Sequence, residues 1–239
     1  MTAAHSPAKR LAFYATPVHE CSYLPERHAV TLFADPHTPM NNAVYSELAR
    51  FGFRRSGAYV YRPRCEGCED CIAVRIPVGE FRPDRSQRRT WERNRDLQLT
   101  VRGAVFDEEH FELYKRYTRG RHPGGGMDSD SPTQYRQFLL STWSDTRFVE
   151  FRKDGRLLAV AVVDCLDDGL SAMYTFYDPD ETRRGLGVLA VLWQIAEARR
   201  LELPWVYLGY LIEACPKMSY KLRYHPLEGF VQGSWRRLP

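Results

Sequence analysis

The order of structural elements between residues 147 and 212 constrains the fold of this chain more than any other feature. Three apolar or alternating runs predict antiparallel strands: 147–151, 157–163 and 170–177. Asp154-Gly155 supplies the first hairpin turn and Asp167-Asp168-Gly169 the second. A helix opened by the glycine-rich turn Arg183–Gly187 follows, and a strand over 205–212 completes the series.

A helix that starts at a glycine-rich turn presents unpaired backbone N–H groups to an anion. Antiparallel strands, such a helix and a further strand form a layout that resembles the GCN5-related N-acyltransferase domain. The resemblance implies an α+β fold in which residues 101–239 form an N-acyltransferase-like catalytic domain. The glycines alone leave open a turn that simply ends a strand.

Residues 1–100 show a different pattern of apolar segments and turns, which predicts an N-terminal domain that mixes strands with a helix. Asn41 or Asn42 can cap a helix that Gly52 ends. Runs at 59–61 and 72–76 predict strands on either side of a cysteine-rich loop. The chain is therefore expected to divide into an N-terminal cysteine- and arginine-rich domain, residues 1–100, and a C-terminal catalytic domain, residues 101–239.

The loop between these strands carries Cys65, Cys68 and Cys71 in the spacing Cys-x2-Cys-x2-Cys. Cys21 can supply a fourth thiolate once the chain is folded. Four thiolates suit a zinc ion or an iron–sulfur cluster. The alternative is a set of reduced thiols without a metal, because structural disulfides are rare in the cytoplasm.

An arginine-rich helix is expected directly after this region. Four arginines at positions i, i+3, i+4 and i+8 share one face of it: Arg85, Arg88, Arg89 and Arg93. Guanidinium groups match the geometry of phosphates, so this arginine face predicts binding to a nucleic acid or another polyanion. The alternative is a solvated helix whose arginines pair with Asp84, Glu92 and Asp96.

Composition limits the remaining possibilities. The chain has 239 residues, of which 44% are hydrophobic, and this is enough for a large core. Its net charge of +4 is small, so a site for a polyanion must come from local clustering of arginines. No run of about 18 apolar residues and no signal-peptide core occur, so we expect a cytoplasmic protein without a membrane anchor.

Further motifs extend over nearly the whole chain. In the N-terminal half they are Cys21–Pro25, Phe53–Tyr59, Tyr61–Pro63, the three cysteines and Ser86–Arg89. In the C-terminal half they are Tyr114–Tyr117, Arg121-His122, Tyr177–Pro179, Gly185–Gly187 and Tyr207–Lys221. Together they closely resemble the bacterial leucyl-tRNA–protein transferases, or aspartate/glutamate leucyltransferases, which are related to the eukaryotic arginyl-tRNA–protein transferases.

This resemblance implies an aminoacyltransferase that moves leucine from leucyl-tRNA to the α-amine of proteins with N-terminal Asp or Glu and marks them for degradation by the N-degron pathway. An aminoacyl-tRNA carries its own activated ester, so the chemistry requires no cofactor. A free α-amine has a pKa near ~8, so part of it is neutral at cytoplasmic pH. The reaction then needs positioning and oxyanion stabilisation more than a covalent nucleophile.

Three alternatives remain open from the residues. Arginine could be the transferred residue. A coenzyme A-dependent N-acetyltransferase would use Arg183–Gly187 to hold a pyrophosphate. A metal- and RNA-binding module without enzymatic activity would use only the cysteines and the arginine face.

Four residues are candidates for the chemistry: Tyr207, Tyr210, Asp178 and Glu213. The two tyrosines should lie on opposite faces of a strand, so only one should face the reacting centre. Either carboxylate could orient the incoming ammonium group or accept its proton. Splayed strands around 174–177 and 207–210 are expected to supply backbone N–H groups for the oxyanion.

Mostly cationic side chains are candidates for holding the acidic side chain of the acceptor or the end of the tRNA. These candidate substrate-binding residues are Arg75, Arg121, His122, Lys217, Tyr220 and Lys221. Lys217 and Lys221 are four residues apart and would share a helix face. The arginine face would bind the tRNA backbone.

Overall fold

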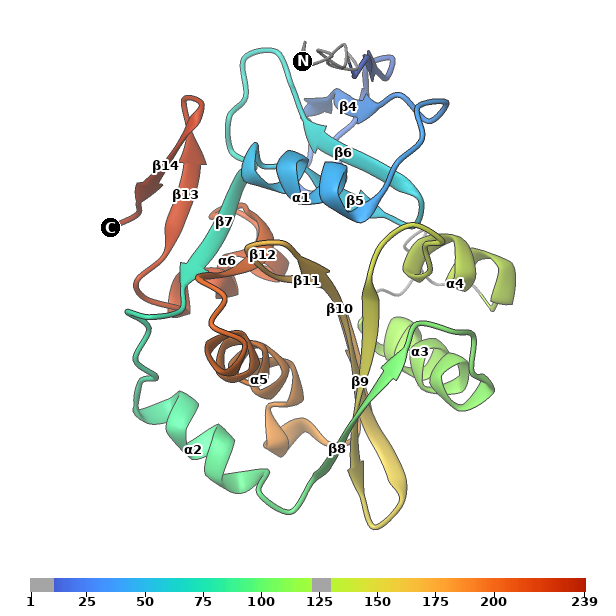
Figure 1. Cartoon of the computed structure of the whole chain (residues 1–239), viewed down its shortest axis with the longest axis vertical. Helices are drawn as coiled ribbons and strands as arrows, with labels where there is room; N and C mark the ends of the chain where they lie inside the picture. Colours follow the sequence, from blue (N-terminus) through green and yellow to red (C-terminus); the bar gives the residue numbers. More distant parts are fainter. Residues whose placement is uncertain (1–10, 122–129) are drawn as a thin grey trace, which may run out of the picture.

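The structure, a computed structural model, describes residues 11–121 and 130–239 (Figure 1). They form a mixed α/β fold with one large and one smaller sheet. The larger sheet contains, in spatial order, β14 (Ser234–Arg237), β13 (Glu228–Val231), β7 (Ile72–Pro77), β12 (Trp205–Leu211), β11 (Gly169–Tyr177), β10 (Arg156–Leu166), β9 (Thr146–Lys153) and β8 (Gln98–Gly103). Of the strand pairs described, β11 with β12 is parallel and the others are antiparallel.

The smaller sheet belongs to the N-terminal part of the chain. It contains, in spatial order, β1 (Phe13–Ala15), β4 (Thr31–Ala34), β6 (Tyr59–Pro63) and β5 (Arg54–Ser56). A separate short ladder joins β2 (His19–Glu20) to β3 (His28–Ala29). The helix α1 (Asn42–Arg50) packs with this sheet and contributes Tyr45, Leu48 and Ala49 to a common core.

Helices cover both faces of the larger sheet (Figure 1). On one face lies α5 (Leu186–Arg200), with α2 (Arg85–Arg93) packed against it. On the other face lie α3 (Glu108–Arg121) and α4 (Pro132–Leu139). The short elements are η1 (Thr182–Arg184), α6 (Pro216–Ser219) and η2 (Tyr220–Arg223). None of the described helices combines the length and the apolar character that crossing a membrane requires.

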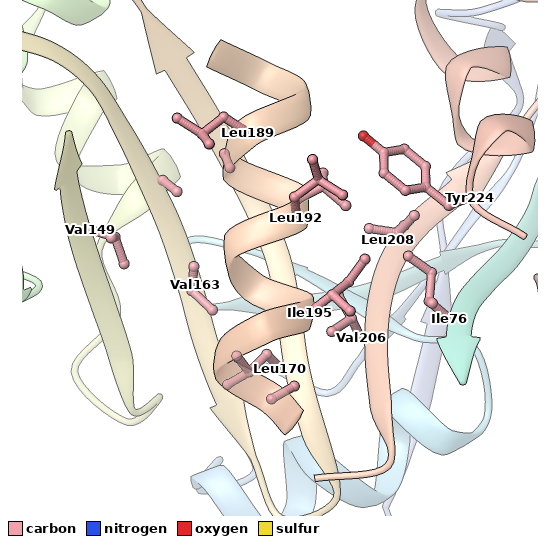
Figure 2. Close-up of a cluster of buried hydrophobic side chains, with 14 of the residues drawn as sticks. Ile76, Val149, Val163, Leu170, Leu189, Leu192, Ile195, Val206, Leu208 and Tyr224 are labelled. Carbon is pink, nitrogen blue, oxygen red and sulfur yellow. The ribbon is translucent and has the colours of Figure 1, made fainter. Parts of the chain in front are cut away.

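The central strand β10 shows why the sheet is covered on both sides. Ala161 and Val163 pack with α5, whereas Val160 and Val162 pack with α3. Side chains alternate between the faces of a strand, so a run that is apolar at every position must be buried on both. Figure 2 shows the core on the α5 side, where Leu192 and Ile195 meet side chains of β12 such as Leu208.

The expected elements form close to their predicted bounds. Asn41 caps α1 through its side chain, and Gly52 follows the helix with a φ of +79°. Asp84 caps α2 in a reciprocal arrangement with the third residue of that helix. Asp154 and Gly155 turn between β9 and β10 with φ values of +49° and +83°, the left-handed conformation that such a tight turn requires.

The expected division at residue 100 does not separate two sheets. The strand β7, from the N-terminal part, lies between β13 and β12 in the larger sheet, and β8 spans residue 100 at its edge. Val74 and Ile76 of β7 are 1% and 0% exposed and pack in the core on the α5 side. Their apolar side chains need this cover, so the N-terminal part contributes a strand to the core of the larger sheet, while α1 and the smaller sheet pack in a separate cluster.

Candidate functional site

The larger sheet opens between β11 and β12. The two strands pair only over Gly169–Ser171 and Trp205–Tyr207. Beyond these residues each strand is irregular, because β11 shifts register against β10 after Ala172 and β12 shifts against β7 before Gly209. The splayed arrangement expected here is therefore confirmed, and the opening is called the fork below.

Arg54 of β5 occupies the base of the fork. Its Nη1 donates to Ser171 Oγ at 2.8 Å, and its Nη2 donates to the carbonyl oxygen of Ala172 at 2.5 Å. Gly209 has a φ of +80°, and a Cβ on it would lie 3.4 Å from Arg54 Nε. The contacts of Arg54 are more than 100 residues away in the chain, so no local sequence pattern pointed to it.

Aromatic side chains line the β11 side of the fork. Tyr117 of α3 packs edge-on against Tyr177 and Tyr174 of β11, with ring centroids 4.8 and 6.2 Å away. Burial raises the pKa values of Tyr117 and Tyr174, so both hydroxyls stay protonated. The hydroxyl of Tyr174 is buried without a hydrogen-bond partner in the described structure.

The segment that follows β12 lies on the other side of the fork. Lys217 is exposed on α6, whereas Lys221 in η2 is 3% exposed. The expectation that these lysines share a helix face is wrong, because the chain changes from α-helix to a 3-10 turn at Tyr220. Burial, and then the positive charge of Arg54, lower the pKa of Lys221 to about 7, while Cys215 opposes the shift.

Tyr207 and Tyr210 lie on the same face of β12, not on opposite faces as expected. The bulge at Gly209 adds one residue between them and breaks the alternation. Tyr210 donates its hydroxyl to the carbonyl oxygens of Gly52 at 3.0 Å and Tyr61 at 3.1 Å. Tyr207 donates to Asp168 at 3.2 Å. The hydroxyl of Tyr210 thus connects β12 to the N-terminal part, and that of Tyr207 connects it to the turn between β10 and β11, so both are engaged in structural hydrogen bonds.

The two candidate carboxylates differ in their surroundings. Asp178 is 0% exposed and forms ion pairs with Arg116 at 2.7 Å and with Arg156. Burial opposes ionisation of Asp178, but the Asp180 N–H and the two arginines outweigh it and lower its pKa. A carboxylate held in this way is a poor proton acceptor. Glu213 is exposed in the turn after β12.

The remaining cationic candidates are placed less favourably than Lys221 for binding a carboxylate at the fork. Arg75 pairs with Glu228 at 2.9 Å, and its guanidinium lies over the rings of Trp205 and Trp235, with centroids at 3.5 and 4.3 Å. Arg121 is exposed at the end of α3, close enough to Tyr117 to affect its pKa. His122 lies outside the described residues.

The arginine face of α2 points away from the core. Gln87, Thr90 and Asn94 are buried, whereas the four arginines of the face are exposed. The acids that could have neutralised them are engaged elsewhere, because Asp84 caps the helix, Glu92 pairs with Arg95, and Asp96 pairs with Arg184 and Lys153. Arg93 also donates to the backbone carbonyl of Arg183.

The N-terminus of α5 lies between the buried face of α2 and the fork. Gly185 lies against Thr90 of α2, since a Cβ on it would be 3.4 Å from Thr90 Cγ2. Gly187 lies against Tyr177, with the corresponding distance also 3.4 Å. Arg184, a cation expected to bind pyrophosphate in an acetyltransferase, forms two hydrogen bonds of 2.9 Å with Asp96. The turn is therefore used to pack α2 onto α5.

The cysteines gather in one region but do not form a metal site. Burial raises the pKa of Cys71 to about 12, and the nearby Cys65, Cys21 and Cys68 raise it further, so the four thiols are neighbours. Among residues 11–121 and 130–239, no group of three or more His, Cys, Asp or Glu side chains is arranged to hold a metal ion. As placed, the thiols do not fit the zinc or iron–sulfur site that their spacing suggested.

Comparison with known proteins identifies relatives over almost the full length. The family description "Arginine-tRNA-protein transferase, C terminus" matches residues 109–231, and "Arginine-tRNA-protein transferase, N terminus" matches residues 19–89. The chain is 54% identical to the aspartate/glutamate leucyltransferase of Hahella chejuensis, over 96% of this chain and 98% of that protein. The enzymes of the same name from Pseudomonas fluorescens and Nitrosococcus oceani are 54% and 53% identical over 95% and 93% of this chain, and over 96% and 94% of their own lengths.

A solved structure, that of L-PGS from Bacillus licheniformis, shares the fold. It superposes with a TM-score of 0.51 at 12% sequence identity, over 71% of this chain and 59% of that protein. At this identity the likeness concerns the arrangement of the sheet and helices.

Proposed function

This chain belongs to the arginine-tRNA–protein transferase family, among the aspartate/glutamate leucyltransferases, and we propose that it transfers leucine from leucyl-tRNA to the α-amine of proteins that begin with Asp or Glu. The structural observation that supports this proposal most directly is the fork. It offers unpaired strand edges, tyrosine side chains and buried cations between two splayed strands of the larger sheet.

The fork suits attack by an amine on an ester. The neutral α-amine forms a C–N bond to the carbonyl carbon of the leucyl ester, the C–O bond to the terminal ribose breaks, and the ribose hydroxyl leaves with the tRNA. The proton lost by the amine is balanced by the one that the leaving ribose oxygen takes up, through solvent, to become a hydroxyl. Because the ester is already activated, the protein contributes positioning and stabilisation of the oxyanion. Strand N–H groups that β11 and β12 leave unpaired at the fork are suitable donors for it.

The arginine face is the proposed site for the tRNA backbone. Arg85, Arg88 and Arg89 are exposed and make no ion pair within the described residues, so their charge remains available to phosphates. The opposite, buried face of α2 packs through Thr90 on the N-terminus of α5, which also contacts Tyr177. On this basis, a tRNA bound along the exposed face of α2 would extend its aminoacylated end to the fork.

The wider role also belongs to this proposal. An N-terminal leucine added to an acidic N-terminus would mark the modified protein for the N-degron pathway, in the cytoplasm where charged tRNA is found. The division into an N-terminal domain and a C-terminal N-acyltransferase-like domain is proposed in the same sense, with β7 shared between them.

Incubation of the full chain with leucyl-tRNA or arginyl-tRNA and with matched peptides tests the function. We expect leucine to be transferred to peptides that begin with Asp or Glu at least about 100-fold faster than to those that begin with Lys or Arg, because juxtaposed like charges are unfavourable by several kcal/mol. Peptide products are identified by mass spectrometry. Arginine transfer that exceeds leucine transfer, or binding of acetyl-coenzyme A in place of leucyl-tRNA, would contradict the proposal.

A further inference from the structure

Two buried cations meet at the fork. Arg54 is 8% exposed at its base, and Lys221 is 3% exposed in η2 at its side. They are close enough that the charge of Arg54 adds to the effect of burial in lowering the pKa of Lys221. Within the described residues, neither side chain forms an ion pair with an Asp or Glu.

The contacts of these side chains orient them without compensating their charge. Arg54 donates to a hydroxyl and a carbonyl oxygen, both neutral. Lys221 Nζ lies 3.5 Å from the carbonyl oxygen of Met218 and 3.6 Å from its Sδ, which are long contacts. The same Nζ lies 4.7 Å from the ring centroid of Tyr220. An ammonium group with three donors is left under-satisfied.

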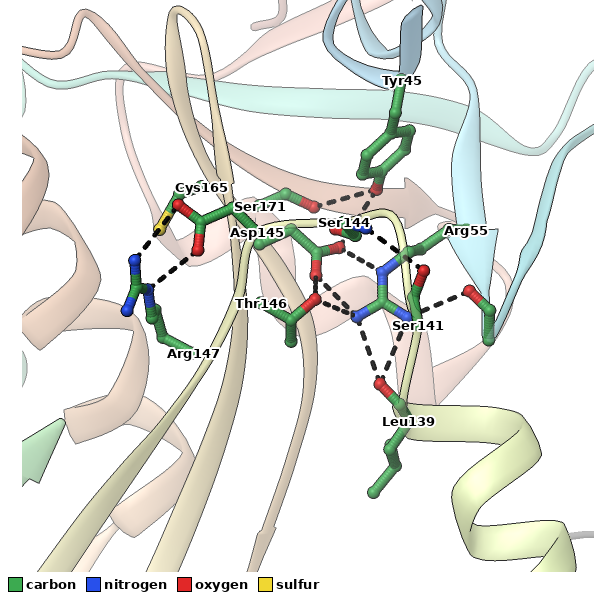
Figure 3. A network of polar contacts seen from close by, with 12 residues as sticks. Tyr45, Arg55, Leu139, Ser141, Ser144, Asp145, Thr146, Arg147, Cys165 and Ser171 are labelled. Carbon is green, nitrogen blue, oxygen red and sulfur yellow. Dashed lines mark hydrogen bonds and ion pairs between the residues drawn. The ribbon is translucent and has the colours of Figure 1, made fainter. Parts of the chain in front are cut away.

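A buried carboxylate near Arg54 is already committed. Asp164 accepts from the side chain of Arg55 at 2.6 and 2.8 Å and from Thr146 at 2.8 Å. The hydroxyl of Tyr45 lies 3.3 Å from Asp164 and 3.4 Å from Ser171, the partner of Arg54, which pairs with Asp164 across β10 and β11 (Figure 3 shows Tyr45 and Ser171). Its charge is therefore compensated within the network around Arg55.

A buried cation without a counterion is unfavourable, and a bound anion relieves the penalty. We propose that Lys221, with Arg54 beside it, is the specificity site for the acidic side chain of the acceptor, whose carboxylate pairs with Lys221 Nζ inside the fork. This assignment rests on the proposed function and names the residues that would select Asp and Glu. Their positions in the sequence made four cations candidates for this role. Among the candidates that the structure describes, Lys221 is distinguished because it is buried and forms no ion pair.

The chemistry of the acceptor fits this placement. In Asp and Glu the carboxylate lies one side chain away from the α-amine, so a carboxylate anchored at the side of the fork leaves the amine free to reach the ester. Asn and Gln have nearly the same shape but no charge. They would leave both cations unpaired, and a site built for a charged group discriminates strongly against such an analogue.

The test compares Lys221→Met with a matched control, Arg223→Met, which removes an exposed cation from the same short helix. Leucine transfer is measured to peptides that differ only in an N-terminal Asp, Asn, Glu or Gln. In Lys221→Met, we expect kcat/KM for the Asp and Glu peptides to fall by about 30-fold or more, with little change for Asn and Gln. The preference for acidic acceptors should collapse, while Arg223→Met keeps it.

The outcomes separate this inference from the proposed function. If the wild-type chain transfers no leucine, the function itself fails. If the wild type transfers leucine and Lys221→Met keeps the wild-type ratio of Asp to Asn transfer, the specificity role is overturned. The same holds if Lys221→Met loses transfer to all four peptides equally. Lys221→Arg, which retains the charge, should restore part of the preference if the role is electrostatic.

Proton uptake provides a second measurement. Burial and the charge of Arg54 lower the pKa of Lys221, which faces Arg54, Cys215 and the Tyr220 ring, to about 7, so part of the side chain population is neutral at pH 7.5. Pairing with a carboxylate favours the charged ammonium, so binding of an Asp dipeptide should take up a fraction of a proton from buffer. Titration calorimetry in buffers of different ionisation enthalpy measures this uptake. Its presence in the wild type and absence in Lys221→Met is expected, and equal uptake in both would contradict the assignment.

Discussion

Replacing Arg55 by Met should lower the free energy of unfolding by about 3–5 kcal/mol, because it leaves the carboxylate of Asp164 buried and unpaired. Both side chains are 0% exposed and lie 2.6 Å apart. Arg55 also donates to the carbonyl oxygens of Leu139 and Gly57 and to Thr146 (Figure 3). The network joins β5 to α4, β9 and β10, so its loss should loosen the N-terminal part from the larger sheet.

Thermal unfolding measures this effect. For a chain of this size the midpoint should fall by roughly 6–20 °C. The matched control is Arg237→Met, which breaks an exposed pair with Glu80 at 2.7 Å and should change stability by less than about 1 kcal/mol. The double variant Arg55→Met with Asp164→Leu should recover much of the loss, because no unpaired charge remains. A single variant as stable as the wild type would show that the pair does not hold the two parts together.

Replacing Arg88 and Arg89 by Ala should weaken binding of leucyl-tRNA strongly. If each arginine contacts one phosphate, the slope of log K against log salt concentration should become shallower by about 1.4–1.8. Both side chains are exposed on α2 and form no ion pair with a described acid, so their loss should leave the fold intact. Binding is measured by filter retention or fluorescence anisotropy over a series of salt concentrations.

A double variant outside α2 is the control for charge alone. Arg236→Ala with Arg237→Ala removes the same net charge from β14, an edge strand that carries none of the four arginines of the face. It should leave the salt slope nearly unchanged. If both double variants behave alike, the tRNA is attracted by the overall charge and not by the arginine face.

These experiments address three parts of one arrangement. The arginine face would bind the tRNA backbone, the N-terminus of α5 packs between the buried face of α2 and the fork, and the buried cations would select the acceptor. Asp178, a candidate base from the sequence, is held by Arg116 and Arg156 instead. Catalysis would then depend mainly on the positioning of the amine and the ester, as expected for a donor that is already activated.

Local structure could be predicted because its causes are local. The side chain of Asn41 caps the helix that it begins, Asp84 caps α2, and Asp154-Gly155 adopts the left-handed turn between β9 and β10. Four arginines spaced by helical turns share a face whatever the rest of the chain does. The family could be predicted as well, because its motifs are contiguous and extend over most of the sequence.

The site itself was decided by tertiary structure. Tyr207 and Tyr210 were expected on opposite faces of β12, but the bulge at Gly209 places them on the same face, and such a bulge depends on how β7 pairs with β12. Lys217 and Lys221 were equivalent by spacing, yet only Lys221 is buried, because the helix tightens at Tyr220. No partner for Arg75 could be predicted from the sequence, whereas in the fold it forms an ion pair with Glu228.

The sequence by itself determined the helices α1, α2 and α5, the strands β9 to β12, the arginine face and the family, since these depend on residues close together in the chain. Tertiary structure alone decided that β7 enters the larger sheet, that Arg54 lies at the base of the fork, and that Lys221 is buried. The physical reason is that burial and charge pairing depend on partners far away in the chain. Arg54 and Ser171 are separated by 117 residues, and no spacing along the sequence encodes their meeting.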